Sequence, residues 1–221
     1  MPLIVGTSYI ILIYVGTDNI NLEAGLKTAD TYHHGHLRAE LIRRGLEALE
    51  VEGADSLSLR LLAEQAGVSK TAPYRHFRDR DEFLGALADE GFRLLHLGLE
   101  GFAKDGPPGV AAMGRAYMGF AVAHPALYRL MNSPLVCAMP EGSMPWARRS
   151  LLLLGQTLAG GSTADPAVTD TAGDGGFDTN AAAATWAYIH GLVLLRIDGL
   201  FPSDLPAPDW DLLASTVPRL D

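Results

Sequence analysis

The sequence predicts an all-α protein in two parts, an N-terminal three-helix helix-turn-helix unit and a C-terminal helical bundle. After residue 30, apolar residues recur at helical spacing and no alternating strand pattern is present. Glycine, proline and aspartate clusters interrupt the helices at Lys104–Gly109 and Gly160–Asn180. Of the 221 residues, 48% are hydrophobic and 19% are charged, a composition that can build a core and excludes a wholly disordered chain.

The N-terminal segment, residues 1–30, is expected to be an extension outside the folded body. Leu3–Val15 is nearly all apolar, yet no Lys or Arg precedes it and no small-residue cleavage pattern follows it, as a signal peptide requires. The run is also shorter than the roughly 20 residues that span a bilayer as a helix. Its β-branched residues favour a strand or a loosely attached extension. Packing on the body and a membrane role are the alternatives.

The first two predicted helices follow this extension and open a domain spanning 31–95. Gly53 ends the first helix because glycine readily takes a left-handed C-cap conformation. Ser58 can cap a short second helix, Leu59–Ala66, which buries Leu62 and Ala63. The apolar face of the first helix consists of Leu37, Leu41, Ile42, Leu46 and Leu49.

A turn and a third helix complete the predicted helix-turn-helix. Gly67 suits a left-handed turn residue, and Ser69 offers its hydroxyl to the free N–H groups of a helix over Lys70–His76. A fourth helix starts after Asp79, and Glu82 three residues later completes a capping box. The inner face of this fourth helix is formed by Phe83, Leu84, Leu87, Gly91, Leu94 and Leu95.

The distribution of charge indicates the partner better than the net charge does. A net charge of −9 argues by itself against a nucleic-acid binder. From Ser69 to Arg80, however, the local net charge is +3. DNA affinity depends on cations placed near phosphates, and the acidic body is remote. A charge run alone is typical of a solvated face, but this one falls on the second helix of a helix-turn-helix, which enters the major groove.

The C-terminal part, 96–221, is predicted to be a helical bundle. His124 and Pro125 stop its first helix. Trp186 and His190 lie four residues apart and so share one helix face. A cavity here would suit a small, largely apolar ligand with one or two polar handles. The predicted helices are Val110–Ala123, Pro125–Met131, Trp146–Leu158, Asn180–Leu200 and Asp209–Leu220. The candidate cavity residues, for which ordinary core packing is the alternative, are Met113, Tyr117, Phe120, His124, Tyr128, Met131, Trp146, Trp186 and His190.

Three motifs resemble one family of regulators. The run SLRLLAEQAGVSKTAPYRHFRDRDEFL resembles the DNA-binding signature of the TetR family of transcriptional regulators. YHHGHLR upstream resembles the YHHGDLR start of one branch, with His36 in place of the aspartate. TWAYIHGLVLLRIDGLF resembles the Trp-x-x-x-His-Gly motif of that branch's C-terminal domain, the WHG domain. The resemblance implies an all-helical homodimer whose fourth helix joins a DNA reader to a ligand-binding, dimerising domain.

Within such a DNA reader each residue can be given a role. Lys70, Thr71 and Ala72 open the third helix and are expected to face base edges. Other residues are expected to contact phosphates and fix the register on DNA. Pro73 removes an amide early in this helix, where the cost is small. The predicted phosphate contacts are Ser69, Tyr74, His76 and Arg80, together with His34 and Arg38 in the N-terminal arm.

Metal binding, nucleotide hydrolysis and nucleophilic catalysis are not the leading interpretations of the sequence. His33, His34 and His36 could ligate a transition metal, but they coincide with the arm motif. No GxxxxGK[ST] or GxSxG motif is present, and Cys137 has no convincing histidine partner. We therefore expect no enzyme activity and no cofactor. We expect a cytoplasmic, ligand-responsive, dimeric repressor bound to a palindromic operator and to no membrane, its effector unidentified. A helical sensor or interaction module that no longer binds DNA is the alternative.

Overall fold

The computed structural model describes residues 34–103, 107–140, 142–159 and 179–216. Every regular element in these ranges is a helix, which confirms the predicted class. The predicted extension over 1–30 lies outside the described residues, as does most of the predicted Gly160–Asn180 loop. The elements are α2 (His34–Glu52), η1 (Ala54–Ser56), α3 (Leu59–Gln65), η2 (Ala72–Arg75), α4 (Arg80–Ala103), α5 (Pro107–Ala123), α6 (Pro125–Met131), α7 (Pro134–Cys137), α8 (Pro145–Leu158), α9 (Thr179–Ile197) and α10 (Trp210–Ala214).

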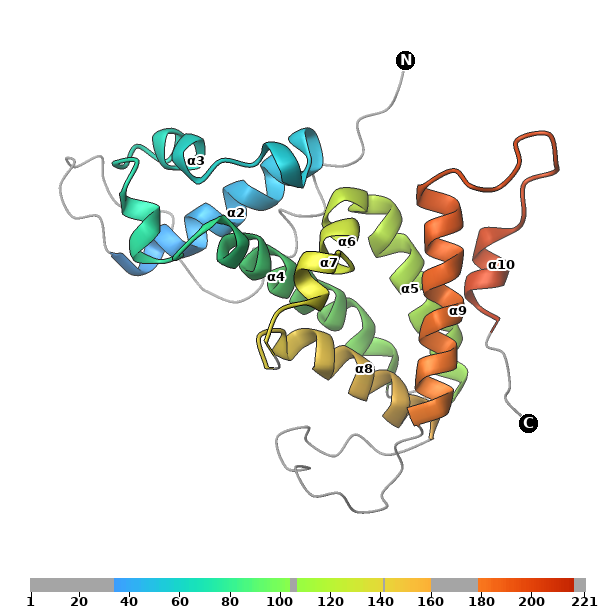
Figure 1. Cartoon of the computed structure of the whole chain (residues 1–221). Helices are drawn as coiled ribbons and strands as arrows, with labels where there is room; N and C mark the ends of the chain where they lie inside the picture. Colours follow the sequence, from blue (N-terminus) through green and yellow to red (C-terminus); the bar gives the residue numbers. More distant parts are fainter. Residues whose placement is uncertain (1–33, 104–106, 141, 160–178, 217–221) are drawn as a thin grey trace, which may run out of the picture.

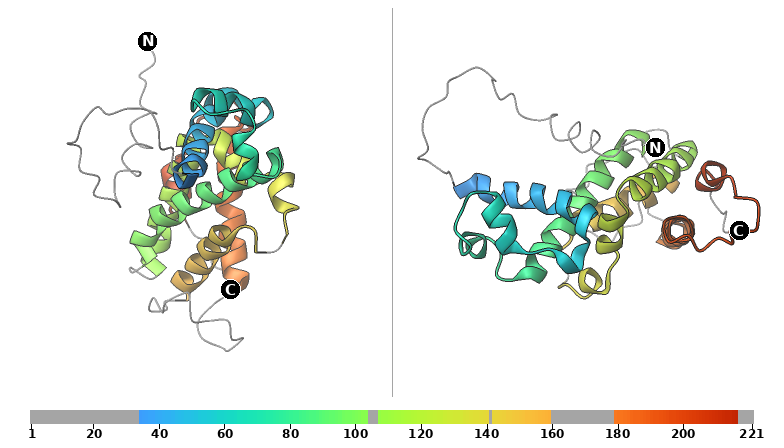
Figure 2. Two further views of the ribbon diagram at one scale, coloured as in Figure 1. Left: turned by 90° about the vertical axis from the view of Figure 1, so that its left-hand side faces the viewer. Right: turned by 90° about the horizontal axis from the view of Figure 1, so that it is seen from above.

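The helices form an elongated molecule with a different unit at each end. Figures 1 and 2 show α2, α3 and the start of α4 at one end and α9 and α10 at the other. The long α4 runs between them and packs against α5, α6 and α8. Both residues at the predicted domain boundary, 95 and 96, therefore lie inside one continuous helix.

The N-terminal helices begin and end where the sequence predicts. Gly53 has a φ of 77° directly after α2, and its N–H donates to the carbonyl of Leu49. Ser58 caps α3 by accepting the N–H of Leu61 at 3.5 Å. A left-handed Gly67, with a φ of 71°, then reverses the chain. Leucines from α2 and α3 pack with Phe77 and Phe83 as one core.

The predicted third helix, Lys70–His76, is wrong in extent and in type. The structure has only the 3₁₀ helix η2, Ala72–Arg75, after a turn at residues 70–71. Pro73 contributes to this outcome, because it has no N–H and the α-type bond from residue 73 back to Ser69 cannot form. The bonds here are of the 3₁₀ type, Ala72 N–H to Ser69 and Tyr74 N–H to Thr71. The recognition element is therefore a compact turn.

α4 starts at the predicted cap. The Asp79 carboxylate accepts the N–H of Glu82 at 2.8 Å, and the Glu82 carboxylate accepts the N–H of Arg78 at 2.8 Å. This arrangement confirms the predicted capping box, with the return bond one residue earlier than in its usual form. The inner face is buried as predicted, at Phe83, Leu84, Leu87, Gly91, Leu94 and Leu95.

The C-terminal bundle follows the predicted helices with shifted ends. α5 starts at Pro107, so Pro107–Gly109 is helical and not loop, because proline is tolerated in the first helical turn. α9 ends at Ile197, three residues before its predicted end. There Gly199 takes a φ of 63° and Leu200 N–H donates to Leu195, a Schellman motif that stops the helix. Asp209 caps α10, which is shorter than predicted.

Two clusters of buried residues make up the core. The larger cluster runs from Leu37 in α2 to Leu153 in α8, so the N-terminal unit and the bundle share one interior through α4. The smaller cluster joins α5, α6, α9 and α10 around Tyr128 and Val193, both fully buried. A displacement of α4 would therefore disturb the packing of both the N-terminal unit and the bundle helices α5, α6 and α8.

Candidate functional site

The turn around η2 presents polar and cationic side chains to solvent. Ser69, Lys70, Thr71, Tyr74 and Arg75 are all exposed, and 45% of the Tyr74 side chain is accessible. Pro73, in contrast, is buried, and Ala72 is half-buried against the core. The turn is therefore anchored from beneath by apolar contacts while its outward residues remain free to meet a ligand.

Backbone bonds fix this turn against α3. Val68 N–H donates to Ala63 at 3.0 Å, and Gly67 N–H donates to Glu64 at 3.1 Å. A Cβ at Gly67 would meet nothing within 4 Å, so its positive φ is what requires glycine there. The corner between α3 and η2 is thus held by main-chain geometry, as a helix-turn-helix requires.

The basic side chains near the turn are weakly held. Lys70 lies 3.8 Å from Glu64, and both side chains are well exposed. Arg78 pairs with Asp79 at 2.9 Å in a similarly exposed position. Exposed pairs of this kind contribute little to stability, so both cations can be transferred to phosphates at small cost.

Three further predicted DNA contacts have side chains that are packed against, bonded to or partly buried by the protein itself. The Arg38 guanidinium lies 5.4 Å from the centre of the Phe77 ring and covers it. Arg80 donates to the carbonyls of Leu57, at 3.3 Å, and Ala54, which ties α4 to the loop before α3. The Nε2 atom of His76 is buried with no partner among the described residues. His34 opens α2, but its side chain lies outside the described residues.

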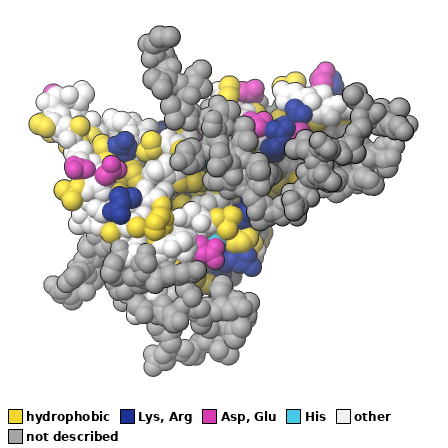
Figure 3. Space-filling model, turned by 180° about the vertical axis from the view of Figure 1, so that it is seen from behind, with side chains coloured by type: hydrophobic (Ala, Val, Ile, Leu, Met, Phe, Trp, Pro, Cys, Tyr) yellow, Lys and Arg dark blue, Asp and Glu magenta, His cyan; other side chains and the backbone are white. Residues whose placement is uncertain are grey.

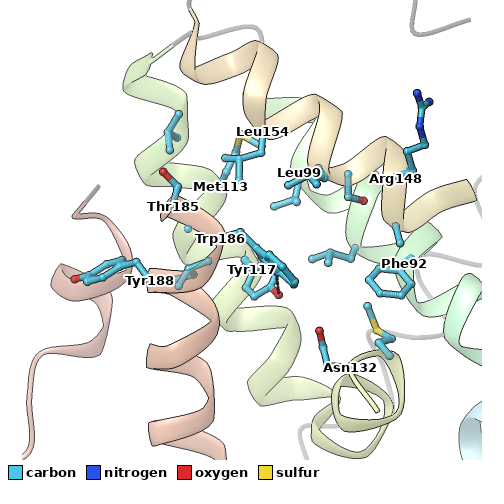
Figure 4. A pocket seen from close by; sticks show the side chains of 18 of the residues that line it. Phe92, Leu99, Met113, Tyr117, Asn132, Arg148, Leu154, Thr185, Trp186 and Tyr188 are labelled. Atoms are coloured by element: carbon cyan, nitrogen blue, oxygen red, sulfur yellow. Dashed lines mark hydrogen bonds between the residues drawn. The ribbon is translucent and has the colours of Figure 1, made fainter. Parts of the chain in front are cut away.

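A cavity of about 430 Å³ lies in the C-terminal bundle. Its walls come from α4, α5, α8 and α9, with residues of α10 at one end, and they are almost entirely apolar. Figure 4 shows side chains from these helices converging on one space, with Phe92 and Leu99 of α4 on one side and Trp186 of α9 on the other. Such a size and lining suit a small apolar molecule.

The predicted cavity residues divide into two groups. The cavity is lined by four of them: Met113, Tyr117, Met131 and Trp186. The others lie outside its lining, although most of them touch a residue that forms it. Tyr128 is fully buried behind Tyr117 and bonded to His190, Phe120 and His124 lie ring to ring 5.2 Å apart, and Trp146 lies 5.3 Å from His96.

Sequence reasoning missed much of the lining. Phe92 and Leu99 sit on the α4 face that a helical period assigns to the core, so periodicity cannot separate cavity wall from packed interior. Asn132, the C-cap residue of α6, also lines the cavity and offers a polar group. Further lining residues that the sequence did not predict as cavity residues are Leu95, Val110, Arg148, Leu154, Thr185 and Tyr188.

Four aromatic side chains form one hydrogen-bonded series beside the cavity, which we call the ring chain: Trp186, Tyr117, Tyr128 and His190. Trp186 Nε1 donates to Tyr117 Oη at 3.3 Å. Tyr117 Oη lies 3.1 Å from Tyr128 Oη, which lies 2.5 Å from His190 Nδ1. Burial raises the pKa of both tyrosines and lowers the pKa of His190, so all four side chains are uncharged at neutral pH.

Other site types are not supported in the described part of the chain. No cluster of three or more His, Cys, Asp or Glu side chains there could hold a metal ion. No described helix combines the length and apolar character needed to cross a bilayer. A second, more open groove lies between the ends of α5 and α9 and the segment that leads to Trp210.

Family comparisons match both ends of this architecture. Residues 41–87 match the family described as "Bacterial regulatory proteins, tetR family", which covers α3, the turn and the start of α4. Residues 110–218 match "Tetracyclin repressor-like, C-terminal domain", which covers most of the bundle. The two matches together span the exposed turn and much of the cavity.

Individual relatives agree with these family matches. The chain is 26% identical to the HTH-type transcriptional regulator Rv1816 of Mycobacterium tuberculosis over 196 residues, covering 76% of this chain and 84% of that protein. A solved protein of unknown function from Rhodococcus sp. RHA1 is 32% identical with a TM-score of 0.63, covering 85% of this chain and 94% of that one. The TetR family regulator PfmR of Thermus thermophilus shares the fold at 18% identity and a TM-score of 0.51, over 79% of this chain and 92% of that one.

Proposed function

Since the chain belongs to the TetR family of transcriptional regulators, we propose that it acts as a homodimeric repressor. It binds a palindromic operator through the η2 turn of each subunit and leaves that operator when a small, largely apolar ligand fills the cavity. The observation that carries this proposal is the exposed cationic turn, anchored from beneath and facing away from the cavity-bearing bundle (Figure 1).

The side chains of the turn suit two kinds of DNA contact. Lys70 and Thr71 are exposed at its start, where Lys can donate to guanine acceptors and the Thr methyl group can touch a thymine methyl group. Ser69, Tyr74 and Arg75 are placed beside them to contact phosphates. Arg80, bonded to the loop before α3, acts mainly by holding α4 in place.

One helix couples the turn to the cavity. α4 starts after a four-residue connection from η2, and the same helix contributes Phe92, Leu95 and Leu99 to the cavity wall. Two reading elements of a dimer must lie about 34–36 Å apart to enter successive major grooves. A ligand that fits better when α4 is displaced therefore favours a spacing that DNA does not accept.

Surface composition of the bundle supports a second copy as partner. α9 carries Trp186 at 44% and Leu195 at 38% accessible surface, and α8 carries Leu151 at 40%. The rear face in Figure 3 also shows hydrophobic side chains over the C-terminal helices, interspersed with basic and acidic ones. Apolar surface of this kind marks interaction sites.

A DNA-capture experiment tests the proposal. Purified full-length protein is mixed with fragments of its own genome, and the retained DNA is sequenced and assayed at several salt concentrations. We expect a palindromic site whose affinity falls steeply with salt, and Lys70→Ala should relax its sequence preference. Absent or salt-independent retention would favour the alternative, a helical sensor that does not bind DNA. Sedimentation of the free protein tests the dimer.

A further inference from the structure

The hydrogen atoms of the ring chain can be placed by elementary chemistry. An indole N–H only donates, so Tyr117 Oη must accept from Trp186. Each phenol carries a single hydrogen. If Tyr117 donates to Tyr128 and Tyr128 donates to His190 Nδ1, every hydrogen of these bonds has an acceptor. The opposite direction would leave the Tyr117 hydrogen without a hydrogen-bonded acceptor among the described residues. The direction from Trp186 to His190 is therefore the one that pairs every hydrogen of the series.

This direction fixes what Tyr117 offers to the cavity. Its oxygen accepts one hydrogen bond and its hydrogen is already donated to Tyr128, so it can accept again but has nothing to donate. Tyr117 lines the cavity, and burial raises the pKa of its hydroxyl, which keeps it uncharged. A cavity ligand therefore meets a hydrogen-bond acceptor at this point of the wall.

Asn132 offers the same kind of group. Its Nδ2 donates to the main-chain carbonyl of Tyr128 at 2.9 Å, and because a carbonyl can only accept, the orientation of the amide is fixed. Its Oδ1 is left as an acceptor. Figure 4 shows the Asn132 side chain pointing toward Tyr117 and Trp186 from the end of α6. Tyr117 of α5 and the C-cap residue of α6 thus direct acceptors at one side of a largely apolar space.

The only ionised side chain among the described lining residues is at the rim. Arg148 of α8 is exposed, and in Figure 4 it points away from the other labelled side chains. The described lining contains no buried cation or carboxylate that could balance the charge of a charged ligand. Burying an unpaired charge costs free energy. The lining therefore favours an uncharged molecule.

We propose that the cavity selects an uncharged, apolar alcohol or phenol, whose hydroxyl donates to the acceptors presented by Tyr117 and Asn132. This inference deepens the proposed function and rests on the cavity being the effector site. A ketone or ether of the same shape brings only acceptors, and would place them against two acceptors. The selectivity follows from the direction of the ring chain. With the reverse direction, Tyr117 would donate a hydrogen bond, and the cavity would prefer ligands that accept one.

Calorimetric titration of the full-length protein with two probes tests the assignment. 2-Naphthol and 2-methoxynaphthalene share one ring system, but only the first can donate. We expect 2-naphthol to bind about tenfold more tightly. Tyr117→Phe should remove most of that preference through weaker 2-naphthol binding, with 2-methoxynaphthalene unchanged. Tyr188→Phe is the matched control: this tyrosine also lines the cavity, but its hydroxyl donates to Leu213, and the preference should persist.

Several results would overturn the assignment: equal affinities, a preference for the ether, no binding of either probe, or a preference that survives Tyr117→Phe. Thermal melting of both variants checks that they fold. The same preparations are assayed for operator retention. Retention of DNA together with equal probe affinities rejects the donor assignment alone, whereas a parent protein that retains no DNA rejects the proposed function.

Discussion

Glu50 and Ala126 are joined across the two parts of the molecule. The carboxylate of Glu50, near the end of α2, accepts the N–H of Ala126 at 3.1 Å and that of Leu127 at 3.0 Å. The first N–H groups of a helix have no partner within it and favour a negative charge. α6 then continues toward Met131, which lines the cavity. One side chain of the DNA-reading unit therefore holds the start of a helix whose far end meets the ligand space.

Removal of this carboxylate should weaken the fold. Glu50→Ala leaves two helix-terminal N–H groups without their acceptor, and we expect the free energy of unfolding to fall by about 1–3 kcal/mol. Urea denaturation followed by circular dichroism measures the change. Glu50→Gln keeps one acceptor oxygen and should cost less.

The control for Glu50 lies one turn earlier on the same helix. Glu47 forms only an exposed pair with Arg43, so Glu47→Gln should change stability by less than about 0.5 kcal/mol. Equal losses at the two positions would show that the contact between α2 and α6 contributes nothing of its own.

Gly114 is expected to tolerate no side chain. A Cβ placed there would lie 1.9 Å from the carbonyl oxygen of Ala214 in α10, a backbone atom that cannot turn aside. Gly114→Ala should destabilise the protein by about 1–3 kcal/mol and displace α10 from the cavity. Gly119→Ala, on the same helix with nothing within 4 Å, should be neutral or stabilising by up to about 1 kcal/mol. Thermal melts of the two variants compare them directly.

Acid should destabilise the protein through His96. Burial lowers the pKa of this side chain, so protons bind the unfolded chain more readily than the folded one below the ordinary histidine pKa of about 6.5. Stability is therefore complete above that pH and decreases as the pH falls toward the folded-state pKa. His96→Leu should show a smaller loss between about pH 7 and pH 5 in urea titrations. The difference between the two proteins at about pH 8 reports packing alone, because histidine is neutral there. An unchanged slope in the variant would exclude His96 as the cause.

Arg75 and Arg80 should separate DNA affinity from fold stability. Arg75 is exposed with no described partner, so Arg75→Ala should weaken binding to all sequences alike and leave the melting temperature unchanged. Arg80→Ala removes two bonds to backbone carbonyls and should also cost about 1 kcal/mol of stability. Fluorescence anisotropy with operator and scrambled duplexes, next to thermal melts, measures both effects. A stable Arg80→Ala protein would show that these bonds are dispensable.

The sequence predicted the elements that depend on local chemistry. Ser58 and Asp79 cap helices, and Gly53 and Gly67 take positive φ values, because each of these effects needs only a few neighbouring residues. The type of η2 was mispredicted for a related reason. The capping pattern at Ser69 favours an α-helix, whereas Pro73 removes the N–H that an α-type bond back to Ser69 needs.

The cavity was only partly predictable, because it depends on which buried side chains fail to meet. Tyr117 and Tyr128 are both aromatic residues on inward helix faces, yet one lines the cavity and the other lies behind it. Trp146 is also a large aromatic residue of the kind that lines cavities, but its ring lies against His96. Helical spacing gives the direction of a side chain, and only the packing of the helices around it decides whether space remains in front of it.

The anchoring of the η2 turn has a consequence for divergence within such regulators. Its shape is imposed by Pro73, the left-handed glycine and the apolar floor, whereas the residues at 69–71, 74 and 75 contribute almost nothing to folding. Those five positions can therefore be rewritten without penalty to the scaffold. Under the proposed function, descendants of one ancestral gene acquire new target sites by changing them, while the proposed ligand response of the bundle is inherited intact.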